Sequence, residues 1–126
     1  MQTTVYRRLV MPEHMNHGDR LFGGVLMAWL DESAALYAIC QMKSRNVVTL
    51  KVSEILFKES VESGDFLIFN ATTNKIGNTS LTIGLEVIKK GIGDDIPDVT
   101  VITCEFVFVK IDSETKKPVP HGLKKE

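Results

Sequence analysis

A chain of 126 residues matches the size of one domain and is long enough to bury a core of its own. Its composition, 44% hydrophobic and 25% charged, is typical of a globular protein and excludes a disordered chain. A net charge of −1 excludes the basic field that favours nucleic-acid binding, and no apolar run is long enough for a transmembrane helix. The amino-terminal residues lack the apolar core of a signal peptide, and no Cys-x-x-Cys spacing occurs. We therefore expect one domain over residues 1–126, located in the cytoplasm, with Cys40 and Cys104 as buried small side chains.

The first two elements in chain order are a strand and a long helix. Residues 3–11 predict the strand, and residues 12–24 predict a polar loop that is rich in glycine. Residues 25–40 contain many good helix formers and neither Pro nor Gly. Their only polar residues are Asp31, Glu32 and Ser33, so they predict a helix that is buried on most sides.

After Arg45 apolar residues alternate with polar ones, which is the period of a strand. Residues 48–56, 66–73, 81–87 and 99–111 predict four more strands, and Gly77-Asn78 predicts a two-residue hairpin turn. Residues 91–98 predict a loop, and residues 112–126 a tail whose end we expect to be frayed. The pattern predicts an α+β fold in which an antiparallel sheet of five or six strands wraps one helix. Because this helix is apolar nearly all round, we expect a curled sheet or a second copy of the chain to cover it, and hence a homo-oligomer.

Asp31 is the residue of the helix that most needs an explanation. Its neighbours three and four positions away are three alanines and one methionine. A carboxylate on such a surface is costly unless it is paired, hydrogen-bonded or protonated. Asp31 either belongs to a narrow solvated stripe with Glu32 and Ser33, or lies in a partly dry pocket as a base or nucleophile. The nearest hydroxyl along the chain, that of Ser33, lies on another helix face, and no Gly-x-Ser-x-Gly motif supports a serine nucleophile.

The loop that begins at Asn16 runs directly into the helix. Gly23 and Gly24 let another group approach the backbone, and the free N–H groups of a first helical turn can bind an oxyanion. The same two glycines also suit a tight turn with no further role. His14 and His17 have no evident third ligand, so we expect no metal. Lysines at or near strand ends either protect sheet edges or offer a basic rim to a phosphate-bearing ligand; they are Lys58, Lys75, Lys89 and Lys90.

The run from Asn16 through Gly23-Gly24 to Asp31 resembles the Asn, Gly-Gly and Asp signature of hotdog-fold acyl-CoA thioesterases. The most similar subgroup is that of the YciA-like bacterial acyl-CoA hydrolases, with Asp19 and Phe22 as near-matches to its Gly-Asp-x-Phe-Gly-Gly run. Later matches extend the resemblance over residues 5–120; they are Phe57, Gly64-Asp65, Gly77-x-Thr79-Ser80, residues 106–109, Asp112 and residues 117–120.

This resemblance implies a hotdog fold, in which two chains join side by side into a continuous sheet and assemble further into tetramers or hexamers. It implies hydrolysis of acyl-CoA to a free carboxylic acid and coenzyme A, with no cofactor beyond the coenzyme A of the substrate. Asp31 matches the carboxylate that activates water or attacks the thioester, and Asn16 matches an amide supplied across the dimer interface. The backbone N–H of Gly24 matches the donor that polarises the thioester carbonyl. The residues expected to contact the substrate are Gly23, Lys58, Gly77, Asn78, Thr79 and Ser80.

Two positions depart from the family pattern. Asn78 stands where the family usually has Arg, and Ser60 stands where it usually has Pro. Both departures concern the binding of coenzyme A, and neither changes the expected catalytic pair of Asp31 and Asn16.

Two other functions stay open beside hydrolysis. A hotdog enoyl-CoA hydratase or dehydratase needs a His paired with an acid, for which His14 or His17 is available. A non-catalytic acyl-CoA sensor needs only the pocket. Asp31 together with Asn16 favours hydrolysis over both. The sequence does not determine the acyl chain length, which depends on the lining of a tunnel between subunits; the candidate lining residues are Phe22, Met27 and Trp29.

Overall fold

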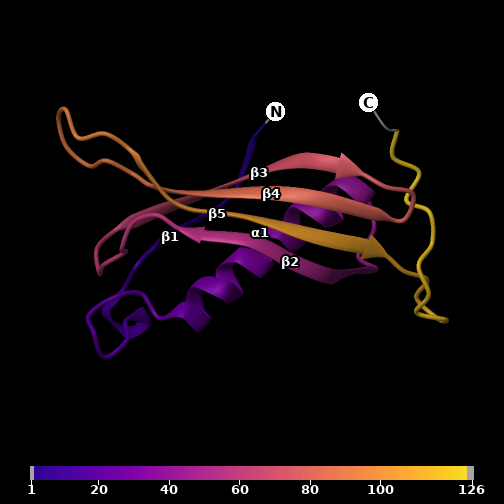
Figure 1. The fold of residues 1–126 in the computed structure, drawn as a ribbon, viewed down its shortest axis with the longest axis horizontal. Helices are drawn as coiled ribbons and strands as arrows, with labels where there is room; N and C mark the ends of the chain where they lie inside the picture. The colour runs from indigo at the N-terminus through magenta and orange to yellow at the C-terminus, as the bar shows by residue number, and fades with distance from the viewer. Residues whose placement is uncertain (1, 125–126) are drawn as a thin grey trace.

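The structure, a computed structural model, describes residues 2–124. One helix lies across one face of a five-stranded antiparallel sheet (Figure 1). The predicted α+β hotdog architecture is confirmed, with five strands among the described residues. The strands, in the spatial order β1-β3-β4-β5-β2, are β1 (Thr3–Leu9), β2 (Val47–Phe57), β3 (Phe66–Ile76), β4 (Ser80–Lys89) and β5 (Val99–Lys110).

The helix α1 (Gly23–Met42) is two residues longer at each end than the prediction. It begins at the glycine pair because Phe22, just before it, is still extended (ψ 129°). It ends where Lys43 adopts a left-handed conformation (φ 52°) and its N–H donates to the Ile39 carbonyl. A short 3-10 helix, η1 (Pro12–His14), precedes α1 in the loop. Within residues 2–124, no helix has the length and apolar character that a membrane crossing requires.

The core lies between α1 and the concave face of the sheet. Its largest fully buried side chains include Leu30 from the helix and Phe69 and Phe106 from the strands. The sheet covers only one side of α1, so Leu36 and Cys40 on the other side are exposed. The prediction that both cysteines are buried is therefore wrong for Cys40 and right for Cys104. Burial raises the pKa of the Cys104 thiol to about 12.

The chain reverses between β3 and β4 as predicted, but the turn differs from the expected one. The loop has three residues, 77–79, and none of them has a positive φ. A primed two-residue turn requires a positive φ. Gly77 instead leaves space for the hydroxyl of Ser80, which would have to rotate away from a Cβ at this position.

The carboxy-terminal tail does not leave the sheet directly. Ile111 bridges to Pro118, and residues 118–123 return along the end of the sheet that carries the β3–β4 turn (Figure 1). The end that we expect to be frayed includes residues 125 and 126, which lie outside the described residues.

Candidate active site

Asp31 lies about two turns into α1, on its exposed side, and faces the edge strand β2. The hydroxyl of Thr49 on β2 donates a hydrogen bond of 2.8 Å to Asp31 Oδ1. Glu32 points to the opposite edge of the sheet, where Tyr6 on β1 donates a hydrogen bond of 2.7 Å to Glu32 Oε2. This hydrogen bond is the main cause that raises the pKa of Tyr6. Two consecutive carboxylates are thus oriented by hydroxyls from two different strands.

The expected stripe of three solvated residues is reduced to Asp31 and Glu32. Ser33 is fully buried, and its hydroxyl donates a hydrogen bond of 2.7 Å to the Trp29 carbonyl. The hydroxyl that faces Asp31 belongs instead to Thr49, 18 positions away. No local spacing signals this pair, since only the packing of α1 beside β2 brings the two residues together.

The start of α1 offers free backbone donors. The first intrahelical hydrogen bond runs from the Leu26 N–H to the Phe22 carbonyl (3.1 Å). No hydrogen bond of the described residues uses the N–H of Gly23 or Gly24. The ring of Phe22 lies against Gly24, since a Cβ there would come within 2.7 Å of Phe22 Cε2. Gly24 therefore makes room for this ring, and both Gly23 and Gly24 are exposed.

A cavity of about 420 Å³ lies beside the helix start, where the loop before α1 meets the end of β2. It brings together Gly23 and Lys58, two of the residues expected to contact substrate. The cavity combines apolar side chains with two cations and one carboxylate; its lining is Arg20, Leu21, Gly23, Leu26, Phe57, Lys58, Glu59, Ser60, Val61 and Ile102. Such a lining suits an amphiphilic ligand with an apolar part and an anionic part.

Asn16 holds the loop in front of the helix. Its side-chain carbonyl oxygen accepts the N–H groups of Gly18 (2.8 Å) and Arg20 (3.2 Å), and its backbone N–H donates to the Arg20 carbonyl (2.7 Å). No hydrogen bond of residues 2–124 joins Asn16 to Asp31 or uses the Asn16 Nδ2 group. The amide nitrogen of Asn16 is therefore available to a group outside its own chain.

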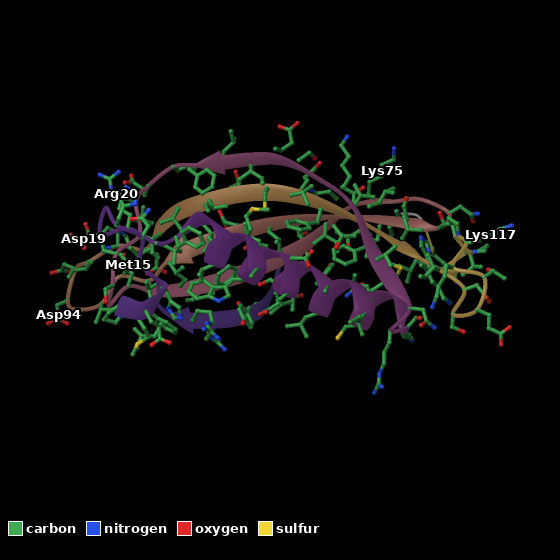
Figure 2. All side chains as sticks on the ribbon, turned by 90° about the horizontal axis from the view of Figure 1, so that it is seen from below. Met15, Asp19, Arg20, Lys75, Asp94 and Lys117 are labelled. Carbon is green, nitrogen blue, oxygen red and sulfur yellow. The ribbon has the colours of Figure 1, made fainter. Side chains whose placement is uncertain are left out.

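The hairpin residues lie at the other end of the molecule. Figure 2 shows Asp19 and Arg20, beside the helix start, at one end, and Lys75 and Lys117 at the opposite end. The loop that contains Asn78 and Thr79 follows Lys75 by only a few residues. One chain alone therefore does not bring the hairpin to the helix start.

The histidines of the loop have structural surroundings. The Nδ1 atom of His14 accepts the Met11 N–H (2.9 Å), and its ring meets Trp29 edge to face at 4.9 Å between centroids. His17 is exposed. No group of three or more His, Cys, Asp or Glu side chains in the described part of the chain is arranged to hold a metal ion.

Comparison with known proteins shows which proteins the chain is similar to. The sequence profile described as thioesterase superfamily matches residues 18–95. The chain is 34% identical over 119 residues to acyl-CoA thioester hydrolase YciA of Salmonella typhimurium, a match that covers 92% of this chain and 89% of that protein.

Two solved structures share the fold. One is a hexameric thioesterase from Yersinia pestis, with a TM-score of 0.85 and 31% identity, covering 94% of this chain and 93% of that one. The other is an acyl-CoA hydrolase from Staphylococcus aureus in complex with butyryl coenzyme A, coenzyme A and coenzyme A disulfide. It has a TM-score of 0.83 and 28% identity, covering 94% of this chain and 71% of that one. Both similarities extend over almost the whole described fold.

Proposed function

The chain belongs to the thioesterase superfamily, and on that basis we propose that it hydrolyses acyl-CoA thioesters to a free carboxylic acid and coenzyme A. The Salmonella relative is named an acyl-CoA thioester hydrolase, and the S. aureus structure contains butyryl coenzyme A. The structural observation that carries the proposal is the 2.8 Å hydrogen bond that orients the Asp31 carboxylate on the open side of α1. No cofactor is part of the proposal, and we propose the cytoplasm as the location.

In the proposed reaction Asp31 acts on the thioester carbonyl carbon, directly or through water. The hydrogen bond from Thr49 engages Oδ1 of Asp31 and leaves Oδ2 for the reaction. As a base, Asp31 takes a proton from water while the new C–O bond forms, an effect worth about 10²- to 10⁴-fold in rate. The C–S bond then breaks, and the thiolate of coenzyme A takes up the proton. As a nucleophile, Asp31 forms an acyl anhydride as the C–S bond breaks and coenzyme A leaves as the thiolate; water then hydrolyses the anhydride to the carboxylic acid and the Asp31 carboxylate, and the proton that water releases goes to the thiolate.

The helix start supplies the proposed electrophilic stabilisation. Negative charge develops on the carbonyl oxygen during attack, and the free N–H of Gly24 is a fixed donor for it. A donor of this kind is typically worth about 10²-fold or more in rate. Gly23 and the cavity with Lys58 and Arg20 beside it suit the apolar and anionic parts of an acyl-CoA.

We propose that a second chain completes the site. In this proposal, the free Nδ2 group of Asn16 faces Asp31 of the partner subunit, and the hairpin contacts the coenzyme A part of a substrate bound at the partner's helix start. The exposed edge strand β2 offers a surface for that partner, because Leu50 and Phe57 on it are 67% and 64% exposed. The relative from Yersinia pestis is hexameric, which supports assembly of this chain into dimers and hexamers.

The test is thiol release from a panel of acyl-CoAs of increasing chain length. We expect wild-type protein to release thiol and Asp31→Ala to lose about 10²-fold or more of the rate. Glu32→Ala is the matched control, because Glu32 is the neighbouring exposed carboxylate and faces the other edge of the sheet. Retention of intact acyl-CoA without thiol release contradicts the proposal and indicates a sensor. A change in enoyl absorbance without thiol release indicates a hydratase.

A further inference from the structure

The carboxy-terminal tail is tied back to the turn between β3 and β4. It reverses direction after β5 at a turn where Asp112 Oδ2 accepts the N–H groups of Glu114 (3.0 Å) and Thr115 (2.9 Å). The returning segment then pairs with the end of β5, where the Val119 N–H donates to the Lys110 carbonyl (2.9 Å). This path brings His121 against the β3–β4 turn.

His121 is 9% exposed, and both nitrogens of its ring are hydrogen-bonded. Nε2 lies 2.8 Å from the Ser80 carbonyl, and since a carbonyl only accepts, Nε2 carries the proton. Nδ1 accepts the Leu123 N–H at 3.0 Å. The backbone N–H of His121 donates to the Asn78 carbonyl (3.2 Å). One tail residue thus binds the turn at two points, two residues apart.

These bonds and their neighbours occupy three consecutive backbone carbonyls at the end of the turn, those of residues 78–80. The Asn78 carbonyl accepts from His121, the Thr79 carbonyl accepts from the Lys110 N–H (3.0 Å), and the Ser80 carbonyl accepts from both Gly77 and His121. In contrast, no hydrogen bond of the described residues uses the N–H of Asn78 or Thr79. The N–H groups of Asn78 and Thr79 are therefore left for a ligand, while the carbonyls of Asn78, Thr79 and Ser80 are held by the protein.

We propose that His121 is a positioning residue for coenzyme A, which holds the turn in the conformation that presents Asn78 and Thr79 to the substrate. This inference rests on the proposed function, which assigns the hairpin to substrate binding. Asn78 is short and uncharged, so it cannot reach out to a phosphate as a long cationic side chain does. The affinity of the turn for coenzyme A then depends on how firmly its backbone is held, because backbone groups that are already fixed lose less entropy on binding.

The experiment compares three variants with the wild type. His121→Phe retains an aromatic ring and removes both ring hydrogen bonds, and His121→Gln restores a donor toward the Ser80 carbonyl. Leu123→Ala is the matched control, since it removes a tail side chain packed against the core and leaves the His121 ring in place. Each protein is examined by amide hydrogen exchange at residues 77–82, by calorimetric titration with coenzyme A, and by KM and kcat for thiol release.

We expect His121→Phe to exchange faster at the turn, to bind coenzyme A about 3- to 10-fold more weakly, and to show a KM raised by a similar factor at unchanged kcat. We expect His121→Gln to recover part of the affinity, and Leu123→Ala to lower the melting temperature without changing the affinity. If His121→Phe does not fold, the same comparison is made with His121→Gln. We then expect this variant to exchange faster at the turn than the wild type and to bind coenzyme A more weakly, by less than the factor given for His121→Phe.

Two results overturn the inference. Unchanged exchange at the turn in His121→Phe shows that His121 does not position it. Faster exchange with unchanged affinity for coenzyme A shows that the turn is not part of the binding site. The titration separates this inference from the proposed function, because a wild type that binds coenzyme A but releases no thiol disproves hydrolysis alone.

Discussion

Thr49 on β2 donates a 2.8 Å hydrogen bond to Asp31 on α1, and this contact joins the central helix to the free edge of the sheet. It engages Oδ1 of Asp31, and no hydrogen bond of the described residues uses Oδ2. Both residues are exposed in the single chain. The pair therefore lies at the surface where a second copy of the chain is proposed to dock.

The first prediction concerns Thr49. Thr49→Val keeps the shape of the side chain and removes the hydroxyl, so the carboxylate loses its orienting donor. We expect kcat to fall by about 10-fold, as for the loss of a hydrogen bond to a charged group. Thr49→Ser retains the donor and is expected to keep most of the activity. Equal kcat values for wild type and Thr49→Val in a thiol-release assay contradict the assignment.

The second prediction concerns Gly24. A Cβ at this position comes within 2.7 Å of the Phe22 ring, which must then move. Because Phe22 is 53% exposed, we expect this movement to cost little stability. We expect the displaced ring and the added methyl group to obstruct the helix start, so Gly24→Ala lowers kcat/KM by about 10²-fold, similar to the loss of an oxyanion donor.

The matched comparison for Gly24→Ala is the double variant Phe22→Ala, Gly24→Ala. Without the ring, the added methyl group no longer displaces a neighbour. We expect kcat/KM of the double variant to exceed that of Gly24→Ala, with similar melting temperatures for both. A double variant as inactive as Gly24→Ala shows that the methyl group itself, and not the ring, blocks the site.

The third prediction tests whether the site is shared between chains. We propose that Asp31 of one chain acts with Asn16 of the partner subunit. Inactive Asp31→Ala and Asn16→Ala chains, unfolded together and refolded, should therefore form mixed dimers with one intact site and regain thiol release.

Asp31→Ala mixed with Thr49→Val is the control for that experiment. Asp31 and Thr49 bind each other within one chain, so every site of this mixture carries one of the two substitutions. We expect its activity not to exceed that of Thr49→Val alone. If the Asp31→Ala and Asn16→Ala mixture also stays inactive while mixed dimers are observed by mass spectrometry, the two residues act in the same chain.

The fourth prediction concerns pH and the turn at Asp112. The N–H groups of Thr115 and Glu114 hold the pKa of the Asp112 carboxyl below its ordinary value. A lowered folded-state pKa means that this contribution to stability is present above the unfolded-state pKa and is lost as the pH falls through the folded-state value. We expect the hydrogen-exchange protection factors of residues 112–123, which are corrected for the intrinsic pH dependence of exchange, to fall on acidification below about pH 4. Asp112→Asn should remove this pH dependence, and a persistent dependence in that variant assigns it to another group.

Local pattern was sufficient for the elements and for several candidate residues. The alternation in residues 81–87 and the apolar run of residues 25–40 identify a strand and a helix because burial on one side imposes those periods. Asp31 and the pair Gly23-Gly24 are visible in the sequence because a carboxylate and two glycines are unusual in and beside an apolar helix. The predicted ends of the elements were less accurate, because helix capping and strand pairing extend α1, β3 and β4 beyond their predicted bounds.

Contacts between distant segments were decided only by the tertiary structure. Thr49 faces Asp31 because β2 pairs with β5 at the edge of the sheet and passes beside α1. His121 meets Ser80 because the tail turns back at Asp112 and reaches the β3–β4 turn. The sequence alone determined which residues have unusual chemistry for their local pattern. The order of the strands and the path of the tail determined which of those residues meet, because a hydrogen bond depends on distances in space and not on separation along the chain.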